Sequence, residues 1–525
     1  MKVTSMPEKG FVYLVGAGPG RADLITLRGA ELIKIADCII CDKLANPALL
    51  ELARADAEIV NVPKRIGPGS FTQDQINDIL VEKALEGKTV VRLKGGDPCI
   101  FGRVTEEAVK LNEAGIGFEI VPGITAAIAA SEYTGIMLTD RRYSSQVAFI
   151  TGREADGKQD TNIDWHVLAR FPGTLVFYMG IGTLPLIAEQ LMANGRDAAT
   201  PVALVANATF PTQRVVRAPL SEIVVTCQRE KIEPPALIII GAAAEGDSEL
   251  NWFMRQPLFG KSMVSTRDAA GNAEFARLIA SRGGRPVEFP TFAVKPLTEG
   301  NAFLRALTEL THYDWVIFTS PNGVDVFFDF MTTLGKDARV FASNRLAALG
   351  TKTAEALARY GIRADFVPTV FTGRELGTQL IALANLDKKR ILLLRSELAT
   401  NDLIEVLRQG GADVNNVSFY TAVPQTGDAA ALREQIEQGR IHWLTFASPS
   451  AVRNFFERIA VDVVNAGSVK VASIGPVTTA QLDKLGVHVD LTAPEHTTDG
   501  LLAAIEQAES RTGGVPSAKR RRRSE

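Results

Sequence analysis

The sequence predicts an α/β protein of two or three domains, and three observations support this prediction. At 525 residues the chain exceeds the size at which a single hydrophobic core stops growing. Apolar, strand-like runs alternate with helical patterns along the chain, which is typical of stacked βαβ units. The second half of the chain also repeats its own pattern once, as two similar lobes require.

Composition limits the classes of function. The 57 Lys and Arg residues are balanced by 60 Asp and Glu residues, so the net charge of -3 gives no overall positive field for nucleic acid or an anionic membrane. The first residues lack the apolar core of a signal peptide, and no uncharged run reaches the roughly 20 residues of a spanning helix. We therefore expect a soluble, cytoplasmic protein that binds neither nucleic acid nor membranes.

The four cysteines, Cys38, Cys41, Cys99 and Cys227, are too few and too scattered for a disulfide framework, which favours a reducing compartment. Cys38 and Cys41 have the CxxC spacing, but they lie in the apolar run "ADCIICD". Strand geometry there sends the two side chains to opposite faces. We expect two buried thiols rather than a metal or redox pair, and the five dispersed histidines predict no metal site.

The chain is predicted to consist of a first domain, a linker, a second domain and a tail. Residues 1–245 contain eight strand-like runs, from "FVYLVGAG" to "PALIIIG", and the later four belong to a more β-rich second lobe. The pattern restarts after a linker at 246–258. A second α/β domain covers 259–508, and 509–525 have the composition of a flexible basic tail.

The second domain contains an internal repeat. The run "HYDWVIFTSPNGVDVFFDF" recurs as "IHWLTFASPSAVRNFFERI", so that Ser320 corresponds to Ser448. "SMVSTRD" is echoed by "ILLLRSE", which aligns Arg267 with Arg395. Two similar lobes are expected, and a cleft between such lobes is a natural ligand site.

A glycine-rich turn follows the first strand-like run, in "VYLVGAGPGRADLITLRGAELI". The dinucleotide fingerprint G-x-G-x-x-G accepts Gly16 and Gly18, but Arg21 stands in the place of the third glycine. Pro19 also removes a backbone donor from the turn. Both departures count against the dinucleotide fingerprint. An NAD-dependent oxidoreductase, which is a different enzyme class, is kept as an alternative, and in it Asp42 would bind the ribose.

Two further turns bring bare backbone towards a ligand. In "VVRLKGGDPCIFGR" a strand ends in two glycines followed by Asp97 and Pro98. In "EIVPGITAAIAA" a Pro-Gly turn precedes Thr125 and a helix of small residues. Either turn alone is also explained by ordinary turn chemistry or by core packing.

Taken in order, these motifs resemble the tetrapyrrole methylase family, most closely its uroporphyrinogen-III C-methyltransferases. The resemblance covers residues 10 to 243 and includes "VGAGPG", "RLKGGDP" with "FGR", "VPGITAAIAA", "FYMG" and "PVALV". It implies a homodimer, S-adenosylmethionine bound between two lobes, and two methyl transfers to uroporphyrinogen III that give precorrin-2. The residues implied to bind the cofactor are Pro19, Gly95, Asp97, Ile100, Thr125, Ala126, Met179 and Ala208.

Methyl transfer from a sulfonium is an in-line displacement that mainly needs alignment. The attacking pyrrole carbon must later lose a proton, so a nearby carboxylate is useful. By resemblance Asp42 is the candidate base, and Lys64 in "VPKRIG" is the candidate acid or carboxylate anchor. The alternative for Lys64 is a solvated basic residue.

The second half resembles uroporphyrinogen-III synthase, from about residue 258 to 508. The matching runs are "STRD", "FTSPNGV", "ALGTKTAEAL", "VSFYTAV", "FASPSAV" and "SIGPVTTAQL". The resemblance implies two lobes that exchange their first segments, with "FPTFAV" and "FYTAV" as the crossovers. It also implies closure of hydroxymethylbilane with loss of water.

That reaction needs little base strength, so hydroxyls, cations and backbone donors at strand ends are the expected contacts. Ser320 and Ser448 each precede a proline after a strand, which favours helix N-caps that can also bind a carboxylate. Tyr420 is the candidate for leaving-group assistance, with core packing an equal alternative. The candidate substrate contacts are Arg267, Ser320, Lys352, Arg395, Ser448 and Thr478.

The product of the second half would be the substrate of the first. We therefore expect a bifunctional tetrapyrrole enzyme that supplies cobalamin or sirohaem synthesis. One alternative is a methylase of another tetrapyrrole with a non-catalytic, regulatory synthase-like half. A bilobal module that binds tetrapyrroles without turnover is the other.

Overall fold

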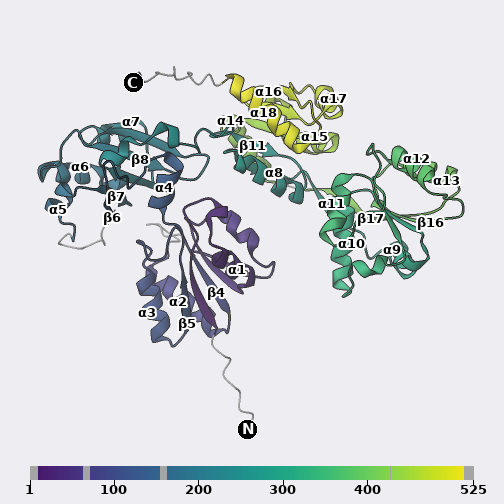
Figure 1. Ribbon diagram of the computed structural model, residues 1–525, viewed down its shortest axis with the longest axis horizontal. Coiled ribbons are helices and arrows are strands. Elements are labelled where there is room, and N and C mark those ends of the chain that lie inside the picture. The colour runs from purple at the N-terminus through teal and green to yellow at the C-terminus, as the bar shows by residue number, and fades with distance from the viewer. Residues whose placement is uncertain (1–9, 63–70, 154–161, 426, 513–525) are drawn as a thin grey trace, which may run out of the picture. The chain divides into compact units, whose positions relative to one another are not determined.

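The computed structural model describes residues 10–62, 71–153, 162–425 and 427–512 (Figure 1). The chain divides into two compact units, and the described residues form four five-stranded sheets. The N-terminal unit comprises Met1–Ser262, Leu278–Arg285 and Glu506–Glu525, and the C-terminal unit comprises Met263–Arg277 and Pro286–Ile505. The predicted α/β class is confirmed, whereas the limits 245, 258 and 508 stay predictions.

The first lobe of the N-terminal unit is a parallel sheet with the order β3-β2-β4-β1-β5. Its strands are β1 (Phe11–Gly16), β2 (Cys38–Asp42), β3 (Glu58–Val62), β4 (Thr89–Lys94) and β5 (Gly117–Val121), and its helices are α1 (Leu27–Ile35), α2 (Gln73–Leu85) and α3 (Val104–Glu113). Because the strands are parallel, Gly16, Asp42 and Lys94 lie at one edge, with Gly16 paired to Lys94. Ligands of open α/β sheets bind at this carboxyl-terminal edge.

The two strand cysteines confirm the alternation of side chains along β2. Cys38 packs in a cluster with Ile76 and Leu80 of α2, whereas Cys41 packs with Leu32 of α1 in a separate cluster. Burial raises the pKa of each thiol to about 11. The pair is therefore two protonated core thiols on opposite faces of the sheet.

The second lobe of this unit is a mixed sheet with the order β6-β7-β10-β8-β9. Its strands are β6 (Val147–Thr151), β7 (Thr174–Tyr178), β8 (Pro201–Ala206), β9 (Arg214–Pro219) and β10 (Ala236–Ile240). Residues of α4 (Ala126–Thr134) pack on one face, and residues of α5 (Trp165–Arg170), α6 (Leu184–Ala193) and α7 (Ile223–Arg229) pack on the other. The helix α4 therefore links the two lobes.

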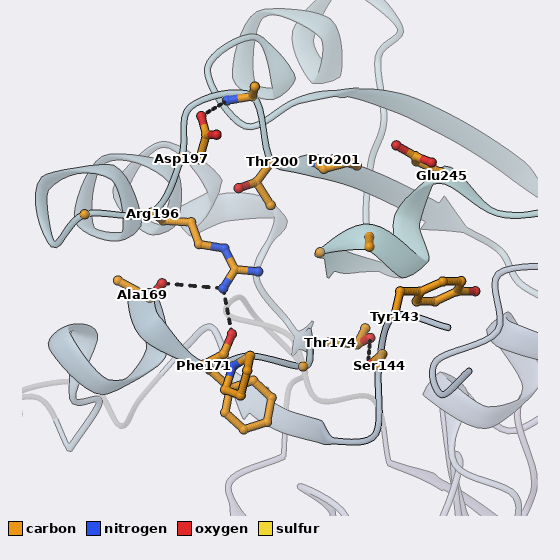
Figure 2. Close-up of a pocket in the computed structure, with 16 residues that line it drawn as sticks. Tyr143, Ser144, Ala169, Phe171, Thr174, Arg196, Asp197, Thr200, Pro201 and Glu245 are labelled. Carbon is orange, nitrogen blue, oxygen red and sulfur yellow. Dashed lines mark hydrogen bonds between the residues drawn. The ribbon is translucent and has the colours of Figure 1, made fainter. Parts of the chain in front are cut away.

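A hollow of about 500 Å³ lies where β7 and β8 begin (Figure 2). Thr174 and Pro201 line it, together with Arg196 and Glu245. Arg196 donates from Nη1 to the carbonyl oxygens of Ala169 and Phe171, at 3.4 and 2.8 Å. Tyr178 ends β7, so this hollow is at the opposite end of the strand from the "FYMG" motif.

The segment predicted as a linker packs against α4. The Asp247 backbone N–H donates to the carbonyl oxygen of Gly135 at 2.9 Å. The Trp252 indole donates to the carbonyl oxygen of Glu132 at 3.0 Å, and its ring lies 5.0 Å from that of Tyr133. Residues 247–252 are therefore ordered against the methylase-like half of the chain.

The C-terminal unit confirms the predicted exchange of segments. One sheet has the order β13-β17-β16-β14-β15 and the other β12-β11-β18-β19-β20. Thus β11 pairs with β18 of the later repeat, while its counterpart β16 pairs with β14 of the earlier one. The strands are β11 (Ser262–Ser265), β12 (Arg285–Glu288), β13 (Phe292–Pro296), β14 (Trp315–Phe318), β15 (Arg345–Ala348), β16 (Arg390–Ser396), β17 (Asp413–Pro424), β18 (Trp443–Phe446), β19 (Lys470–Ser473) and β20 (Leu491–Thr492).

The two crossovers pair with each other. Strand β13 runs antiparallel to the end of β17, with Phe292 opposite Pro424 and Pro296 opposite Tyr420. The helices between residues 269 and 512 are α8 (Ala269–Ser281), α9 (Asn301–Thr308), α10 (Pro321–Thr333), α11 (Thr351–Arg359), α12 (Gly373–Leu383), α13 (Asp402–Gln409), α14 (Ala429–Glu437), α15 (Pro449–Phe456), α16 (Val461–Asn465), α17 (Pro476–Lys484) and α18 (Thr498–Thr512).

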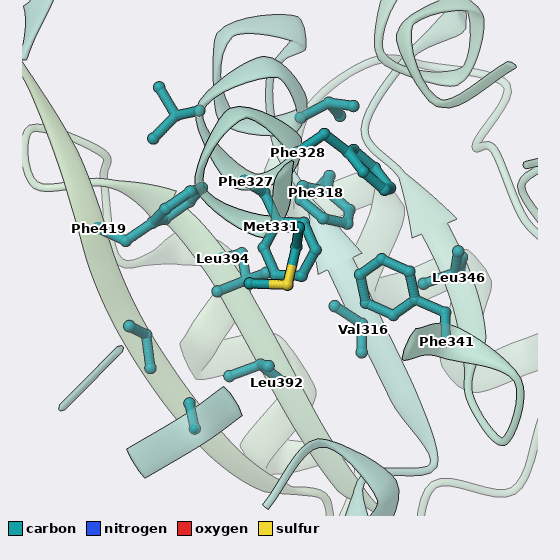
Figure 3. Packing of buried hydrophobic residues seen from close by; sticks show 14 of the residues in the cluster. Val316, Phe318, Phe327, Phe328, Met331, Phe341, Leu346, Leu392, Leu394 and Phe419 are labelled. Carbon is teal, nitrogen blue, oxygen red and sulfur yellow. The ribbon is translucent and has the colours of Figure 1, made fainter. Parts of the chain in front are cut away.

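Aromatic side chains fill the space between α10 and its sheet (Figure 3). The fully buried Phe327 lies 5.6 Å from the ring of Phe318 and 5.0 Å from that of Phe341. Each such side chain removes a large apolar area from water. The start of α10, where Ser320 lies, is therefore supported by densely packed aromatic side chains.

Within the described ranges, no helix combines the length and the apolar character that a bilayer crossing needs.

Candidate active sites

Three glycine-bearing loops of the N-terminal unit touch through their backbones. Gly18 and Gly96 exchange backbone hydrogen bonds, of 3.2 Å from Gly18 N–H and 2.8 Å from Gly96 N–H. A Cβ on Gly123 would lie 2.3 Å from the Gly96 oxygen, and one on Gly16 would lie 2.6 Å from Gly123 Cα. Only residues without a side chain allow this approach. The three sequence motifs therefore meet at the carboxyl edge of the first sheet.

Asp97 fastens two of these loops together. Its Oδ2 accepts a 3.0 Å hydrogen bond from the Gly123 N–H, and its Oδ1 accepts one of 2.8 Å from the Cys99 N–H. Gly95 packs against Leu44, since a Cβ there would come within 2.8 Å of the Leu44 Cβ. Through its two hydrogen bonds, Asp97 therefore stabilises the conformation of the "GGDP" loop.

Tyr178 joins the second lobe to the start of α4. Its hydroxyl lies 2.8 Å from Thr125 Oγ1 and accepts from the Ala127 N–H at 3.0 Å. Burial raises the pKa of Tyr178, although its two hydrogen bonds oppose that shift. The tyrosine therefore stays protonated, and either hydroxyl of the Thr125–Tyr178 pair can donate to the other. Tyr178 was not predicted as a site residue, although it lies in the "FYMG" motif beside Met179.

The loop after β1 also reaches the second lobe. The Arg21 N–H donates to Thr209 Oγ1 at 3.1 Å, and a Cβ on Gly20 would come within 2.5 Å of the Phe210 ring. Pro19 therefore lies in a loop that contacts both the "GGDP" loop and the loop carrying Ala208. Three other predicted cofactor residues pack on the cluster between α4 and the second sheet: Ile100, Ala126 and Ala208.

Backbone strain gathers in the same loops. Of the seven described residues other than glycine that have left-handed backbone angles, five lie in or beside these loops, and such angles cost about 1–3 kcal/mol each. The five flank or include predicted cofactor residues, and they are Phe101 (φ 56), Arg103 (φ 57), Met179 (φ 55), Asn207 (φ 50) and Thr209 (φ 74). Such strain persists only where surrounding contacts impose it, as at ligand sites. Met179 is 53% exposed, so its side chain is open to a ligand.

Asp42 ends β2 at the same edge. Its Oδ1 accepts a 2.5 Å hydrogen bond from Arg92 Nη2, and its side chain is 18% exposed. Lys64 lies outside the described residues. The strand that leads towards it ends at Val62, which pairs with Asp42. None of the residues predicted to bind cofactor lines the hollow shown in Figure 2.

In the C-terminal unit, the structure confirms the prediction that Ser320 and Ser448 are helix N-caps. Ser320 Oγ accepts from the Gly323 N–H at 3.0 Å, and Ser448 Oγ accepts from the Ala451 N–H at 3.2 Å. The remaining hydroxyl contacts differ. Ser320 Oγ lies 2.6 Å from Tyr420 Oη, whereas Ser448 Oγ lies 3.0 Å from Ser450 Oγ.

Tyr420 packs in the core as one alternative predicted, whereas leaving-group assistance stays a prediction. It belongs to the aromatic core, and its hydroxyl bonds Ser320 at the start of α10. Burial raises its pKa, with the Ser320 hydrogen bond acting in the opposite direction. Next to Ser320, Asn322 donates from Nδ2 to Asp268 Oδ2 at 2.9 Å and so ties the two lobes of the unit. Neither Asn322 nor Asp268 was predicted, although both lie in quoted runs.

The predicted cations have different surroundings. Arg267 donates from Nη1 to Thr498 Oγ1 at 2.7 Å. Lys352 is 70% exposed and pairs with Glu355 at 3.3 Å and Glu274 at 3.6 Å. Lys352 is therefore exposed at the surface, whereas Arg267 is partly buried.

Arg395 and Thr478 are buried, in contrast to the expectation that they contact substrate. Arg395 is 5% exposed, because its guanidinium donates to the Thr400 oxygen and, at 2.8 Å, to Asn401 Oδ1. Thr478 is 3% exposed in the first turn of α17. The Arg395 side chain therefore bonds a loop of its own lobe.

Comparison with known proteins supports the family expected for each half of the chain. The family model for tetrapyrrole (corrin/porphyrin) methylases matches residues 12–224, and that for uroporphyrinogen-III synthase HemD matches residues 273–503. A porphyrin biosynthesis protein HemD from Ruminiclostridium josui is 36% identical over 448 residues, which are 85% of this chain and 88% of the relative.

Two further proteins match the N-terminal half. A uroporphyrinogen-III C-methyltransferase from Priestia megaterium is 50% identical over 232 residues, 44% of this chain and 97% of the relative. The crystal structure of a uroporphyrin-III C-methyltransferase from Thermus thermophilus, complexed with S-adenyl homocysteine, has 38% identity and a TM-score of 0.38, covering 45% of this chain and 93% of that one. The chain belongs to the tetrapyrrole methylase family over its N-terminal half and to the uroporphyrinogen-III synthase family over its C-terminal half.

Proposed function

We propose that the chain is a bifunctional enzyme of tetrapyrrole biosynthesis. Its C-terminal half cyclises hydroxymethylbilane to uroporphyrinogen III, and its N-terminal half transfers two methyl groups from S-adenosylmethionine to that product, giving precorrin-2. The observation that carries the proposal is the meeting of the glycine loops around Gly18, Gly96 and Gly123 beside the Thr125–Tyr178 pair. Supply of cobalamin or sirohaem synthesis, a homodimer and a cytoplasmic location belong to the same proposal.

The loops of the N-terminal unit are proposed to hold the cofactor. A Cβ on Gly96 would lie 3.9 Å from Thr125 Cα and from Ala126 N, which is ordinary van der Waals contact, so the "GGDP" loop packs against the start of α4. S-adenosylmethionine supplies an electrophilic methyl group when bound. The residues proposed to hold it are Pro19, Gly95, Asp97, Ile100, Thr125, Ala126, Met179 and Ala208. Hydrogen bonds within the loops fix them before binding, which favours an in-line approach.

Asp42 is proposed to accept the proton that the methylated pyrrole carbon loses. The carboxylate lies at the carboxyl edge of the sheet and is partly exposed. Its Oδ2, to which the described residues make no hydrogen bond, is the proposed base, because Arg92 occupies Oδ1. Lys64 is proposed to anchor a substrate carboxylate or to act as the acid.

The synthase half is proposed to act through hydroxyls and cations. Tyr420 remains protonated because burial raises its pKa, so with Ser320 it can donate to the departing hydroxyl group. Ser448, Arg267 and Lys352 are proposed to bind substrate carboxylates. Arg395 acts in this proposal by holding the loop that carries Asn401, and Thr478 is a buried residue of its lobe.

The experiment supplies the purified chain with hydroxymethylbilane and S-adenosylmethionine and follows the products by absorbance and mass. Doubly methylated product of the type III isomer supports both activities. If only the uncatalysed ring isomer forms, the synthase activity is absent and the alternative of a regulatory half holds. Uroporphyrinogen III supplied directly tests methylation alone, and failure there rejects the methylase proposal.

A further inference from the structure

Beneath Asp42 lies a chain of buried charged side chains. Arg92 and Lys94 project from β4 to the same face, since they are two residues apart. Glu107 of α3 bonds both, with Oε1 3.1 Å from Arg92 Nε and Oε2 2.7 Å from Lys94 Nζ. Gln73 of α2 donates to Glu107 Oε1 at 3.2 Å. Arg92 completes the chain with its 2.5 Å contact to Asp42.

Burial of these charges costs desolvation free energy, which is unfavourable if the network serves only to stabilise the fold. The side chains of Arg92 and Glu107 are 0% exposed and that of Lys94 is 1% exposed. Two residues earlier on the same face of β4, Val90 packs in the apolar core. Buried ion pairs are commonly no more stabilising than apolar residues of similar volume. The charges at these positions therefore call for a role other than stability.

The geometry holds Arg92 in one position. Its Nη1 donates to the Ile40 and Leu93 oxygens at 3.3 and 3.4 Å, in addition to the bonds to Asp42 and Glu107. Burial alone would lower the pKa of Arg92, but the two carboxylates outweigh it and hold that pKa above its usual value. The guanidinium is therefore a fixed, charged fork, which constrains a carboxylate in both position and plane.

Asp42 is the exposed end of this network. At 18% exposure it is the one charged member with appreciable access to solvent, and Arg92 binds Oδ1, while no hydrogen bond to Oδ2 is found among the described residues. We infer that Arg92, Glu107 and Lys94 form a positioning network that fixes the plane of the Asp42 carboxylate and turns Oδ2 towards the pyrrole carbon. This inference rests on the proposed methyltransferase function, and it gives these buried residues a role in turnover without contact to substrate.

The test replaces the network by apolar side chains. The combined variant Arg92→Met, Lys94→Met and Glu107→Leu leaves Asp42 in place but unanchored. We expect a folded protein whose unfolding midpoint is close to the wild-type value, because the three fully buried charges are removed together and the remaining Asp42 carboxylate is partly exposed to solvent. Its kcat for methylation should fall roughly 100-fold, as misplacement of a catalytic group can cause. The Kd for S-adenosylmethionine, measured by calorimetry, should stay within about threefold.

Controls separate positioning from damage and from a wrong function. Lys88→Met removes exposed ion pairs to Glu58 and Glu86 at the opposite end of β4 and should leave kcat unchanged. Arg92→Lys keeps a charge without the fork, so its kcat should lie between the wild-type value and that of the combined variant. A folded combined variant with wild-type kcat overturns the inference.

If the combined variant does not fold, Arg92→Lys decides: a lowered kcat with unchanged KM supports positioning, and an unchanged kcat rejects it. Absence of methylation in the wild-type chain rejects instead the proposed function on which the inference rests.

Discussion

The glycine loops of the N-terminal unit approach one another through backbone atoms, with side chains such as Asp97 adding further hydrogen bonds, whereas the links described at the C-terminal site are made by side chains. Gly18 and Gly96 exchange main-chain hydrogen bonds, and Gly123 packs onto both loops. In the C-terminal unit the corresponding links are Ser320 to Tyr420 and Asn322 to Asp268. Backbone contacts leave no freedom for substitution, while side-chain contacts can be removed one at a time. The first site should therefore fail abruptly on mutation and the second by degrees.

The repeat in the C-terminal unit adds a comparison within that unit. Ser320 and Ser448 are equivalent in sequence and cap equivalent helices. The partner of Ser320 is a buried tyrosine, whereas Ser448 faces another serine. Duplicated lobes thus keep the local structure and differ in the polar chemistry around it.

The largest expected effect comes from the core that supports the side-chain links. Phe327→Ala should destabilise the C-terminal unit by about 3–5 kcal/mol, because it leaves a cavity among Phe318 and Phe341. Denaturant unfolding, followed together with both activities, checks this. Phe371→Ala, at a residue that is 53% exposed, is the control and should cost less than about 0.5 kcal/mol. Loss of methylation along with cyclisation would contradict independent units.

The backbone contacts among Gly16, Gly18, Gly96 and Gly123, which we call the glycine interlock, should be disrupted by a single added methyl group. In Gly123→Ala the new Cβ would lie 2.3 Å from the Gly96 oxygen, an overpacking that costs up to about 3 kcal/mol. Calorimetry should therefore show a loss of S-adenosylmethionine affinity of roughly 100-fold. Gly182→Ala is the matched control, since a Cβ there would meet nothing within 4 Å. Equal affinities in the two variants would show that the interlock does not shape the cofactor site.

The asymmetry of the repeat is tested by removing each capping hydroxyl. Ser320→Ala and Ser448→Ala should each lose a cap worth about 1 kcal/mol. Ser320→Ala should cost about 1–3 kcal/mol more, because it leaves the buried Tyr420 hydroxyl without its partner. Unfolding free energies give the difference. The double variant Ser320→Ala with Tyr420→Phe should recover part of it, and no recovery would mean that the two hydroxyls are not coupled.

The smallest effect is expected at the exposed cation Lys352. Glu355, followed by Glu274, raises its pKa, so its pairing stabilises the fold at neutral pH and is lost as pH rises through that raised pKa. Because the side chain is 70% exposed, Lys352→Met should change the unfolding free energy by no more than about 0.5 kcal/mol. Melting temperatures from pH 7 to 11 should converge for the two proteins. A clear fall in cyclisation by this stable variant supports a contact with substrate.

Local signals in the sequence predicted local structure well. The Ser-Pro pairs predicted both N-caps, strand alternation predicted the opposite faces of Cys38 and Cys41, and the repeat predicted two similar lobes. Each of these depends on residues close in the chain or on a visible duplication.

Contacts between distant segments were not predictable in the same way. Thr125 and Tyr178 are 53 residues apart, Asp268 and Asn322 are 54 apart, and Asp42 and Arg92 are 50 apart. Their meeting depends on strand order, which no pattern in one sequence states. Arg395 was expected to face the substrate's carboxylates, but the loop five and six residues later encloses its guanidinium.

The glycine interlock also limits how the first half can change over evolutionary time. A clash between two side chains can be relieved by a second substitution that makes one of them smaller. At Gly16 and Gly123 the obstructing atoms belong to the main chain of other glycines, and glycine has no smaller replacement. Selection for suppressors of Gly123→Ala should therefore yield true revertants, whereas Ser320→Ala should admit suppressors at Tyr420.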